Sequence, residues 1–131
     1  MIIHHVGVVV QFEKQVKDYL NLIPSKIISQ GYVQIWDVNC IFVGSKKRDP
    51  MVEFIIPLSK KSELHNYNSG RGGIHHIAYA IKDLDEHRVA LADKGIQMLM
   101  KSHIKGAGNF ICNFVSPVYA GGVITEFIQY L

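Results

Sequence analysis

Two imidazole and two carboxylate side chains recur at matching spacings along this chain of 131 residues. One His-His pair stands near the start and another opens the second half; their second members, His5 and His76, lie 71 positions apart. Glu53 follows His5 by 48 positions, and Glu126 follows His76 by 50 positions. The chain therefore contains an internal repeat in which each copy supplies one histidine and one glutamate.

These four side chains suit a divalent first-row metal ion. All four lie inside apolar, strand-like segments, where an ionisable side chain is costly to bury unless it is paired or coordinates a metal. Two imidazoles and two carboxylates fit Co²⁺, Mn²⁺, Ni²⁺, Zn²⁺ or Fe²⁺ and leave positions for water or substrate. Taken singly, each could be a hydrogen-bonded core histidine or a solvent-facing glutamate, but the repeated spacing favours a metal site.

Only one histidine of each pair is expected to face a shared cleft, because adjacent residues of a strand point to opposite faces. The second histidine of each pair shares its face with a small residue, Gly7 in one copy and Ala78 in the other, which leaves room for a ligand. We therefore predict that His5 and His76 face the cleft. The first histidines, expected on the outer face or behind the ligands and without a functional role, are His4 and His75.

The elements that must position these residues follow the same repeat. Module one is predicted to span 1–58, a polar linker 59–72 and module two 73–131. Helices are predicted over 11–23 and 84–94, where apolar residues recur at helical spacing. Strand candidates are 2–10, 26–29, 32–38, 40–43 and 51–56 in module one, with a charged turn over 46–50, and 73–81, 96–100, 110–115 and 123–130 in module two.

A unit of one strand, one helix and further strands leaves an open sheet face that must be covered. Two copies related by a pseudo-two-fold axis can cover it by curling their sheets toward one another. The predicted fold is α+β: a single domain, 1–131, in which two tandem βαβββ modules form a curled, eight-stranded mixed sheet around a metal-binding cleft. His103, on a loop over 102–109, is expected to overhang this cleft.

Composition argues against several other classes of protein. The hydrophobic fraction of 48% fits a folded globular chain, and no apolar run approaches the roughly 20 residues that span a bilayer. The mild net charge of +3 gives no reason to expect nucleic acid or a membrane as a partner. The N-terminal residues show no secretion signal, so Cys40 and Cys112 are expected to be reduced, buried thiols in a cytoplasmic protein.

Four stretches carry a family resemblance: 5–10, 52–58, 72–78 and 121–129. Together they resemble the vicinal-oxygen-chelate superfamily, which includes glyoxalases, bleomycin resistance proteins and dioxygenases, and within it the methylmalonyl-CoA epimerase-like members. The Gly-Gly-x-His-His stretch and the Gly-Gly-Val-x-x-Glu ending are the more specific features. The resemblance implies a small-molecule substrate and a homodimer. The metal ligands that it implies are His5, Glu53, His76 and Glu126.

The resemblance implies a metal-dependent enzyme that chelates vicinal oxygens of a carbonyl or thioester substrate and transfers a proton through an enediolate. Glu126 is the expected base and Glu53 its partner. Returning the proton to the same carbon gives an epimerase, the activity closest to the resemblance. Returning it to the neighbouring carbon gives a glyoxalase I-type isomerase (lactoylglutathione lyase). Gln34 stands near the position where some bacterial epimerases carry a glutamate, so the second acid or base stays open.

Two further classes of protein fit the sequence less well. A metal-free, drug-binding resistance protein normally lacks the full ligand set, which is complete here. An extradiol dioxygenase uses two histidines and one carboxylate with the remaining positions open. Glu53 would occupy a position that dioxygenase chemistry leaves free, which argues against that class.

Overall fold

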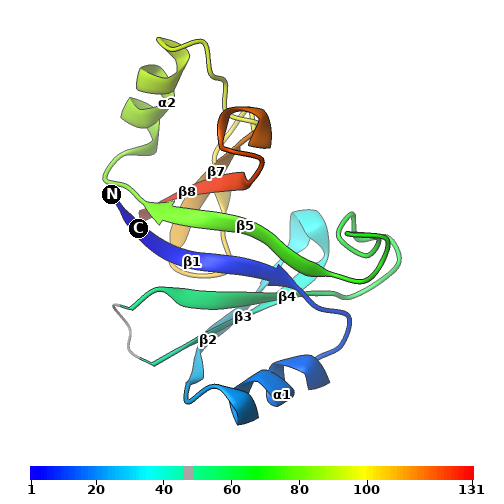
Figure 1. The fold of residues 1–131 in the computed structure, drawn as a ribbon. Coiled ribbons are helices and arrows are strands. Elements are labelled where there is room, and N and C mark those ends of the chain that lie inside the picture. The colour runs from blue at the N-terminus through cyan, green and yellow to red at the C-terminus, as the bar shows by residue number, and fades with distance from the viewer. Residues whose placement is uncertain (46–48) are drawn as a thin grey trace.

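The computed structural model of the chain describes residues 1–45 and 49–131 (Figure 1). Most of the charged turn predicted over 46–50 therefore lies outside the described residues. The described part shows the predicted repeat of elements. The first half contains β1 (Ile2–Val9), α1 (Lys14–Leu22), β2 (Lys26–Val33), the 3₁₀ helix η1 (Gln34–Trp36), β3 (Val38–Gly44) and β4 (Met51–Pro57). The second half contains β5 (Gly73–Ala80), α2 (Leu84–Ala92), β6 (Ile104–Lys105), β7 (Phe110–Val115), the 3₁₀ helix η2 (Pro117–Tyr119) and β8 (Ile124–Tyr130).

All eight strands belong to one sheet, in the order β2-β3-β4-β1-β5-β8-β7-β6. The two halves join where β1 and β5 pair antiparallel, while β1 pairs with β4 and β5 with β8 in parallel. Figure 1 shows β1 and β5 side by side at the centre of the curled sheet, with α1 and α2 at opposite ends of the molecule. The predicted α+β fold with two βαβββ modules and a curled mixed sheet is confirmed.

Each helix packs its apolar residues on its own half of the sheet. Val16 of α1 is buried in a cluster with Ile41 and Phe54, and Leu84 of α2 is buried against Phe127. Among the described residues, neither helix has the length and apolar character needed to cross a membrane. A third apolar cluster, which lines the concave side of the sheet, includes Phe42, Met51, Phe110, Cys112 and Phe114.

Local sequence signals explain where α2 begins. The Asp83 carboxylate accepts a hydrogen bond from the backbone N–H of Glu86 at 2.9 Å and so caps the N-terminus of the helix. Aspartate and glutamate in the first turn add favourable charge at the positive end of the helix dipole.

The structure corrects two strand predictions. The stretch 96–100 is not a strand, because the buried Asn113 side chain, rather than a neighbouring backbone, bonds both the N–H and the C=O of Met100. Pairing with β7 begins only at Ile104–Lys105. The stretch 32–38 is interrupted by η1, where Asp37 adopts a left-handed φ of 49° that a strand does not accept.

Candidate metal centre

The four residues predicted as ligands lie on the four central strands of the sheet. His5 is on β1, Glu53 on β4, His76 on β5 and Glu126 on β8. Backbone register places them around two small residues: Gly7 pairs with Glu53 on one side and His76 on the other, and Ala78 pairs likewise with His5 and Glu126. The small residues leave the concave side free for the four larger side chains, as the sequence predicted.

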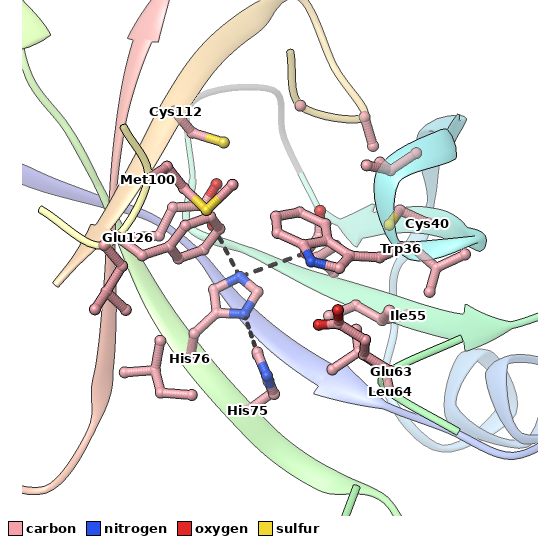
Figure 2. A pocket seen from close by; sticks show the side chains of 18 of the residues that line it. Trp36, Cys40, Ile55, Glu63, Leu64, His75, His76, Met100, Cys112 and Glu126 are labelled. Atoms are coloured by element: carbon pink, nitrogen blue, oxygen red, sulfur yellow. Dashed lines mark hydrogen bonds and ion pairs between the residues drawn. The ribbon is translucent and has the colours of Figure 1, made fainter. Parts of the chain in front are cut away.

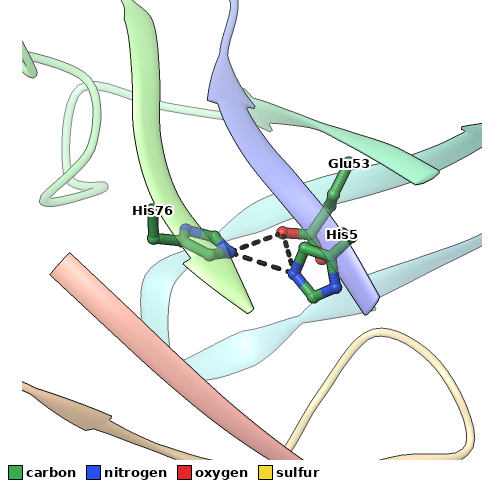
Figure 3. A group of neighbouring side chains, drawn as sticks. All are labelled: His5, Glu53 and His76. Atoms are coloured by element: carbon green, nitrogen blue, oxygen red, sulfur yellow. Dashed lines mark hydrogen bonds and ion pairs between the residues drawn. The ribbon is translucent and has the colours of Figure 1, made fainter. Parts of the chain in front are cut away.

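The functional ends of the four side chains converge. Nε2 of His5 lies 3.0 Å from Nε2 of His76. Oε2 of Glu126 lies 3.1 Å and 2.9 Å from these two nitrogens, and Oε1 of Glu53 lies 3.6 Å and 3.4 Å from them. Figure 3 shows His5, Glu53 and His76 pointing toward a common centre. One nitrogen or oxygen atom of each of these three side chains lies within 4.8 Å of those of the other two.

These donors fit a divalent first-row metal. Two imidazole nitrogens and two carboxylate oxygens form a mixed nitrogen and oxygen set of the kind that such ions prefer. All four residues are buried, and His5 is fully so at 0% exposure. Burial of this many ionisable groups needs compensation from pairing or from a cation.

Without a metal, the cluster carries an ion pair. Burial alone would lower the pKa of His76, but the charge of Glu126 and hydrogen bonds to Glu126 and Glu53 outweigh it and raise that pKa to about 10. Burial alone would raise the pKa of Glu126, but the positive charges of His5 and His76 and their hydrogen bonds hold it well below its ordinary value. A bound cation would take the place of the proton that His76 holds.

The first histidine of each pair lies behind the second, which is one of the two places predicted for it. Two bulges interrupt the β1–β5 pairing, one with His4 as its extra residue and one with His75. Ile3 pairs with Tyr79 and His5 with Ala78, so His4 has no partner on β5. Gly7 pairs with His76 and Val8 with Ile74, so His75 has no partner on β1. The strict alternation of faces therefore fails at both pairs. Of the two places predicted for these residues, the structure shows the one behind the ligands and not the outer face.

Both bulge histidines lie beside the ring of the following histidine. Nδ1 of His4 is 2.7 Å from Nδ1 of His5, and Nδ1 of His75 is 2.9 Å from Nδ1 of His76. Burial and the neighbouring His5 ring lower the pKa of His4 to about 4, and burial and the neighbouring His76 ring lower that of His75 to about 4. Both bulge histidines are therefore neutral at pH 7.

A largely apolar cavity of about 220 Å³ opens beside the four residues (Figure 2). Glu53, His76 and Glu126 line it directly, and Glu63, from the linker between the halves, also lines it. Its walls carry no lysine or arginine among the described residues. The wall residues include Trp36, Cys40, Met100, Phe110, Cys112 and Phe114. A small organic molecule can reach the cluster from this cavity.

Several wall residues were not singled out as site residues from the sequence. Cys40 and Cys112 were predicted only as reduced, buried thiols, and both are free and buried. Burial raises the pKa of each thiol, so both stay protonated and neither is a thiolate ligand. The two cysteines occupy equivalent positions in the two halves, where Cys40 pairs with Ile55 and Cys112 with Ile128. This equivalence is the sequence signal that could have placed both in the wall of the cavity.

Two other sequence expectations fall outside the cavity. His103 does not line it: Nε2 of His103 is 2.9 Å from the Asp85 carboxylate, and Nδ1 is 3.1 Å from the Asn113 amide nitrogen. Gln34, in η1, is likewise not among the lining residues. Glu63 is the additional carboxylate that the cavity offers.

Comparisons with known proteins agree with this geometry. A sequence model of the Glyoxalase/Bleomycin resistance protein/Dioxygenase superfamily matches residues 4–114. YqjC, an uncharacterized protein of Bacillus subtilis (strain 168), is 31% identical over 129 residues, which cover 95% of this chain and 89% of YqjC.

Solved structures of two epimerases share the fold. Methylmalonyl-CoA epimerase from Mycobacterium tuberculosis superposes with a TM-score of 0.90 at 20% identity, covering 98% of this chain and 87% of that one. A selenomethionine-labelled methylmalonyl-CoA epimerase superposes with a TM-score of 0.87 at 25% identity, covering 100% and 96%.

Proposed function

We propose, from the premise that the chain belongs to the glyoxalase/bleomycin resistance protein/dioxygenase superfamily, that it is a metal-dependent enzyme that moves a proton next to a carbonyl group. Its substrate is a small carbonyl or thioester compound with two neighbouring oxygens. The reaction that we favour is epimerisation of the methylmalonyl-CoA type. We also propose that it acts as a homodimer.

The observation that carries this proposal is the convergence of the four side chains. His5, Glu53, His76 and Glu126 present two nitrogens and two oxygens whose nitrogen–nitrogen and nitrogen–oxygen separations lie between 2.9 and 3.6 Å. In the proposal these atoms hold one ion of Co²⁺, Mn²⁺, Ni²⁺, Zn²⁺ or Fe²⁺. When bound, such an ion polarises a substrate carbonyl as a Lewis acid and acidifies the adjacent C–H bond.

The chain's own residues then handle the proton. Glu126 is ionised, because its pKa lies below the ordinary range, and it lines the cavity, so its oxygen can accept a proton from a substrate there. Glu53 enters the same cavity from the other half and is the proposed partner that returns a proton. The apolar walls exclude water from the reacting carbon, which protects a carbanion-like species from unselective protonation.

The alternative is a glyoxalase I-type isomerisation, in which the proton returns to the neighbouring carbon. It uses the same two carboxylates, so the cluster alone favours neither reaction. Similarity to methylmalonyl-CoA epimerases across almost the whole chain supports epimerisation as the first choice.

Proton exchange in deuterated buffer tests this proposal. The metal-loaded protein is incubated with methylmalonyl-CoA and, separately, with the hemithioacetal of glutathione and methylglyoxal. Deuterium uptake at the α-carbon with inversion of the thioester supports the epimerase. Formation of lactoylglutathione would transfer the assignment to glyoxalase I. Metal binding with neither reaction would reject both substrates.

A further inference from the structure

We infer that His4 and His75 are positioning residues for the proposed metal site. Each accepts a hydrogen bond from Nδ1–H of the histidine that follows it, and so leaves Nε2 of that histidine free to bind the metal. This inference rests on the proposed roles of His5 and His76, and it explains why both copies of the repeat carry two adjacent histidines.

The two bulges make this contact possible. In a regular strand, adjacent side chains point to opposite faces and their rings stay apart. An extra residue on one strand brings two successive side chains toward one face. Here the bulges contain His4 and His75, at equivalent places in the two halves. Figure 2 shows the resulting contact between His75 and His76.

The allocation of protons follows from imidazole chemistry. A neutral imidazole carries one N–H, and a metal ligand needs a lone pair on the nitrogen that binds. Nε2 of His5 and Nε2 of His76 face the cluster, so in the metal-bound form each ring carries its proton on Nδ1. Each of these Nδ1–H groups faces Nδ1 of the preceding histidine at a distance of 2.9 Å or less. Nδ1 of the preceding histidine must therefore be the acceptor. His4 and His75 are thus Nε2–H tautomers.

The acceptor rings are themselves fixed by aromatic neighbours. The His4 ring packs edge-on against Phe110 and Tyr130, each with a centroid distance of 5.5 Å. The His75 ring packs against Tyr67 at 4.9 Å, and the Tyr67 hydroxyl donates to the carbonyl of Ile74 at 2.6 Å. A fixed acceptor sets the orientation of the ligand ring before the metal arrives.

Cobalt binding tests the inference with matched pairs of variants. His4→Asn and His75→Asn keep an oxygen acceptor near the position of Nδ1, whereas His4→Leu and His75→Leu fill similar space without one. His65→Leu, on the exposed linker, is the control for losing a histidine elsewhere. Co²⁺ affinity is measured by titration of visible absorption. Histidine tautomers are read by ¹H–¹⁵N NMR, and melting temperature reports folding.

We expect the leucine variants to bind Co²⁺ roughly 10–100-fold more weakly than the wild type, and the asparagine variants to recover most of that loss. We also expect His4 and His75 to show the Nε2–H tautomer when the metal is bound. Leucine variants with wild-type affinity would overturn the inference, as would asparagine variants as weak as leucine or an Nδ1–H tautomer at either bulge. Failure of the wild type to bind Co²⁺ would instead reject the proposed metal site itself, an outcome that is distinct from a wild type that binds Co²⁺ and variants that do so equally well.

Discussion

Gly7 lies opposite His76 across the β1–β5 pair, and the His76 ring occupies the space that a side chain at position 7 would need. A Cβ atom added to Gly7 would lie 2.5 Å from Nδ1 and 2.6 Å from Nε2 of that ring. The absence of a side chain at position 7 therefore lets His76 lie flat over β1 and reach His5.

The variant Gly7→Ala should displace the His76 ring and greatly weaken metal binding. Overpacking of this kind costs about 1–3 kcal/mol of stability, so the variant should still fold. Ala78→Gly, at the equivalent position beside His5, removes a methyl group instead and should keep the metal. Metal affinity and melting temperature of the two variants check this. Full metal affinity in a folded Gly7→Ala protein would contradict the proposed role of the ring.

Glutamine substitutions should separate the two carboxylates. An amide keeps an oxygen for the metal but cannot accept a proton, so Glu126→Gln should retain metal and lose roughly 10²–10⁴-fold in deuterium exchange. Glu53→Gln should retain exchange by Glu126 but lose inversion, because the partner that delivers the proton from the other side is gone. Exchange is followed by NMR and inversion by circular dichroism. Unchanged exchange in Glu126→Gln would show that another group is the base.

The position of these four residues could be predicted from the sequence because duplication carries information that one residue does not. A single buried histidine or glutamate has many explanations, but the spacing from His5 to Glu53 recurs almost unchanged from His76 to Glu126. The same repeat implied two βαβββ modules, which the sheet order confirms.

The stability of the metal-free chain should fall as pH rises above neutrality. The pKa of His76 is raised from 6.5 to about 10, so the ion pair with Glu126 stabilises the fold fully below pH 6.5 and is lost as pH rises toward 10. Melting temperatures of the EDTA-treated protein, taken between about pH 7.5 and about pH 8.5, should therefore decrease. The measurements start above the ordinary histidine pKa of 6.5 because His4 and His75, whose pKa is lowered to about 4, make stability increase with pH up to that point. This range stays below the ordinary thiol pKa of 9.0, where Cys40 would add its own effect.

Glu126→Gln is the control for this pH dependence, since it removes the charge that raises the pKa of His76. Its melting temperature should change less over the same range. Equal slopes for the variant and the wild type would show that the ion pair does not supply the effect.

Asn113 should hold the wall of the cavity in place. Its side chain is fully buried; its oxygen accepts from the N–H groups of Met100 and Phe114, and its amide donates to the Met100 carbonyl. Asn113→Ala removes the acceptor of both N–H groups, while the Met100 carbonyl keeps its bond from Arg88, and should destabilise the protein by about 2 kcal/mol or more. His103→Ala, which removes only an outer partner of Asn113, should have a smaller effect. Denaturant unfolding and amide exchange at Met100 check both. Equal losses in the two variants would contradict this role for Asn113.

Two features escaped prediction because they depend on contacts between distant segments. Alternation along an isolated strand places His4 and His75 outward, and only the pairing of β1 with β5 reveals the bulges. Likewise, the residues next to Asn113 in the sequence are apolar. Nothing in that stretch indicates that the Asn113 side chain makes the hydrogen bonds to Met100 that a neighbouring strand would otherwise make. Side chains that substitute for backbone pairing leave little local signal.

The metal content of the wild type and of His76→Ala is the decisive measurement of whether the four side chains bind a metal ion. Each protein is stripped with chelator, incubated with Co²⁺, dialysed and analysed for cobalt per chain, with Ala78→Gly as a control for altering β5. We expect one cobalt ion per chain in the wild type and in the control, and none in His76→Ala. A wild type without stoichiometric cobalt, or a His76→Ala protein that keeps it, would contradict the proposal that these four side chains form the metal site.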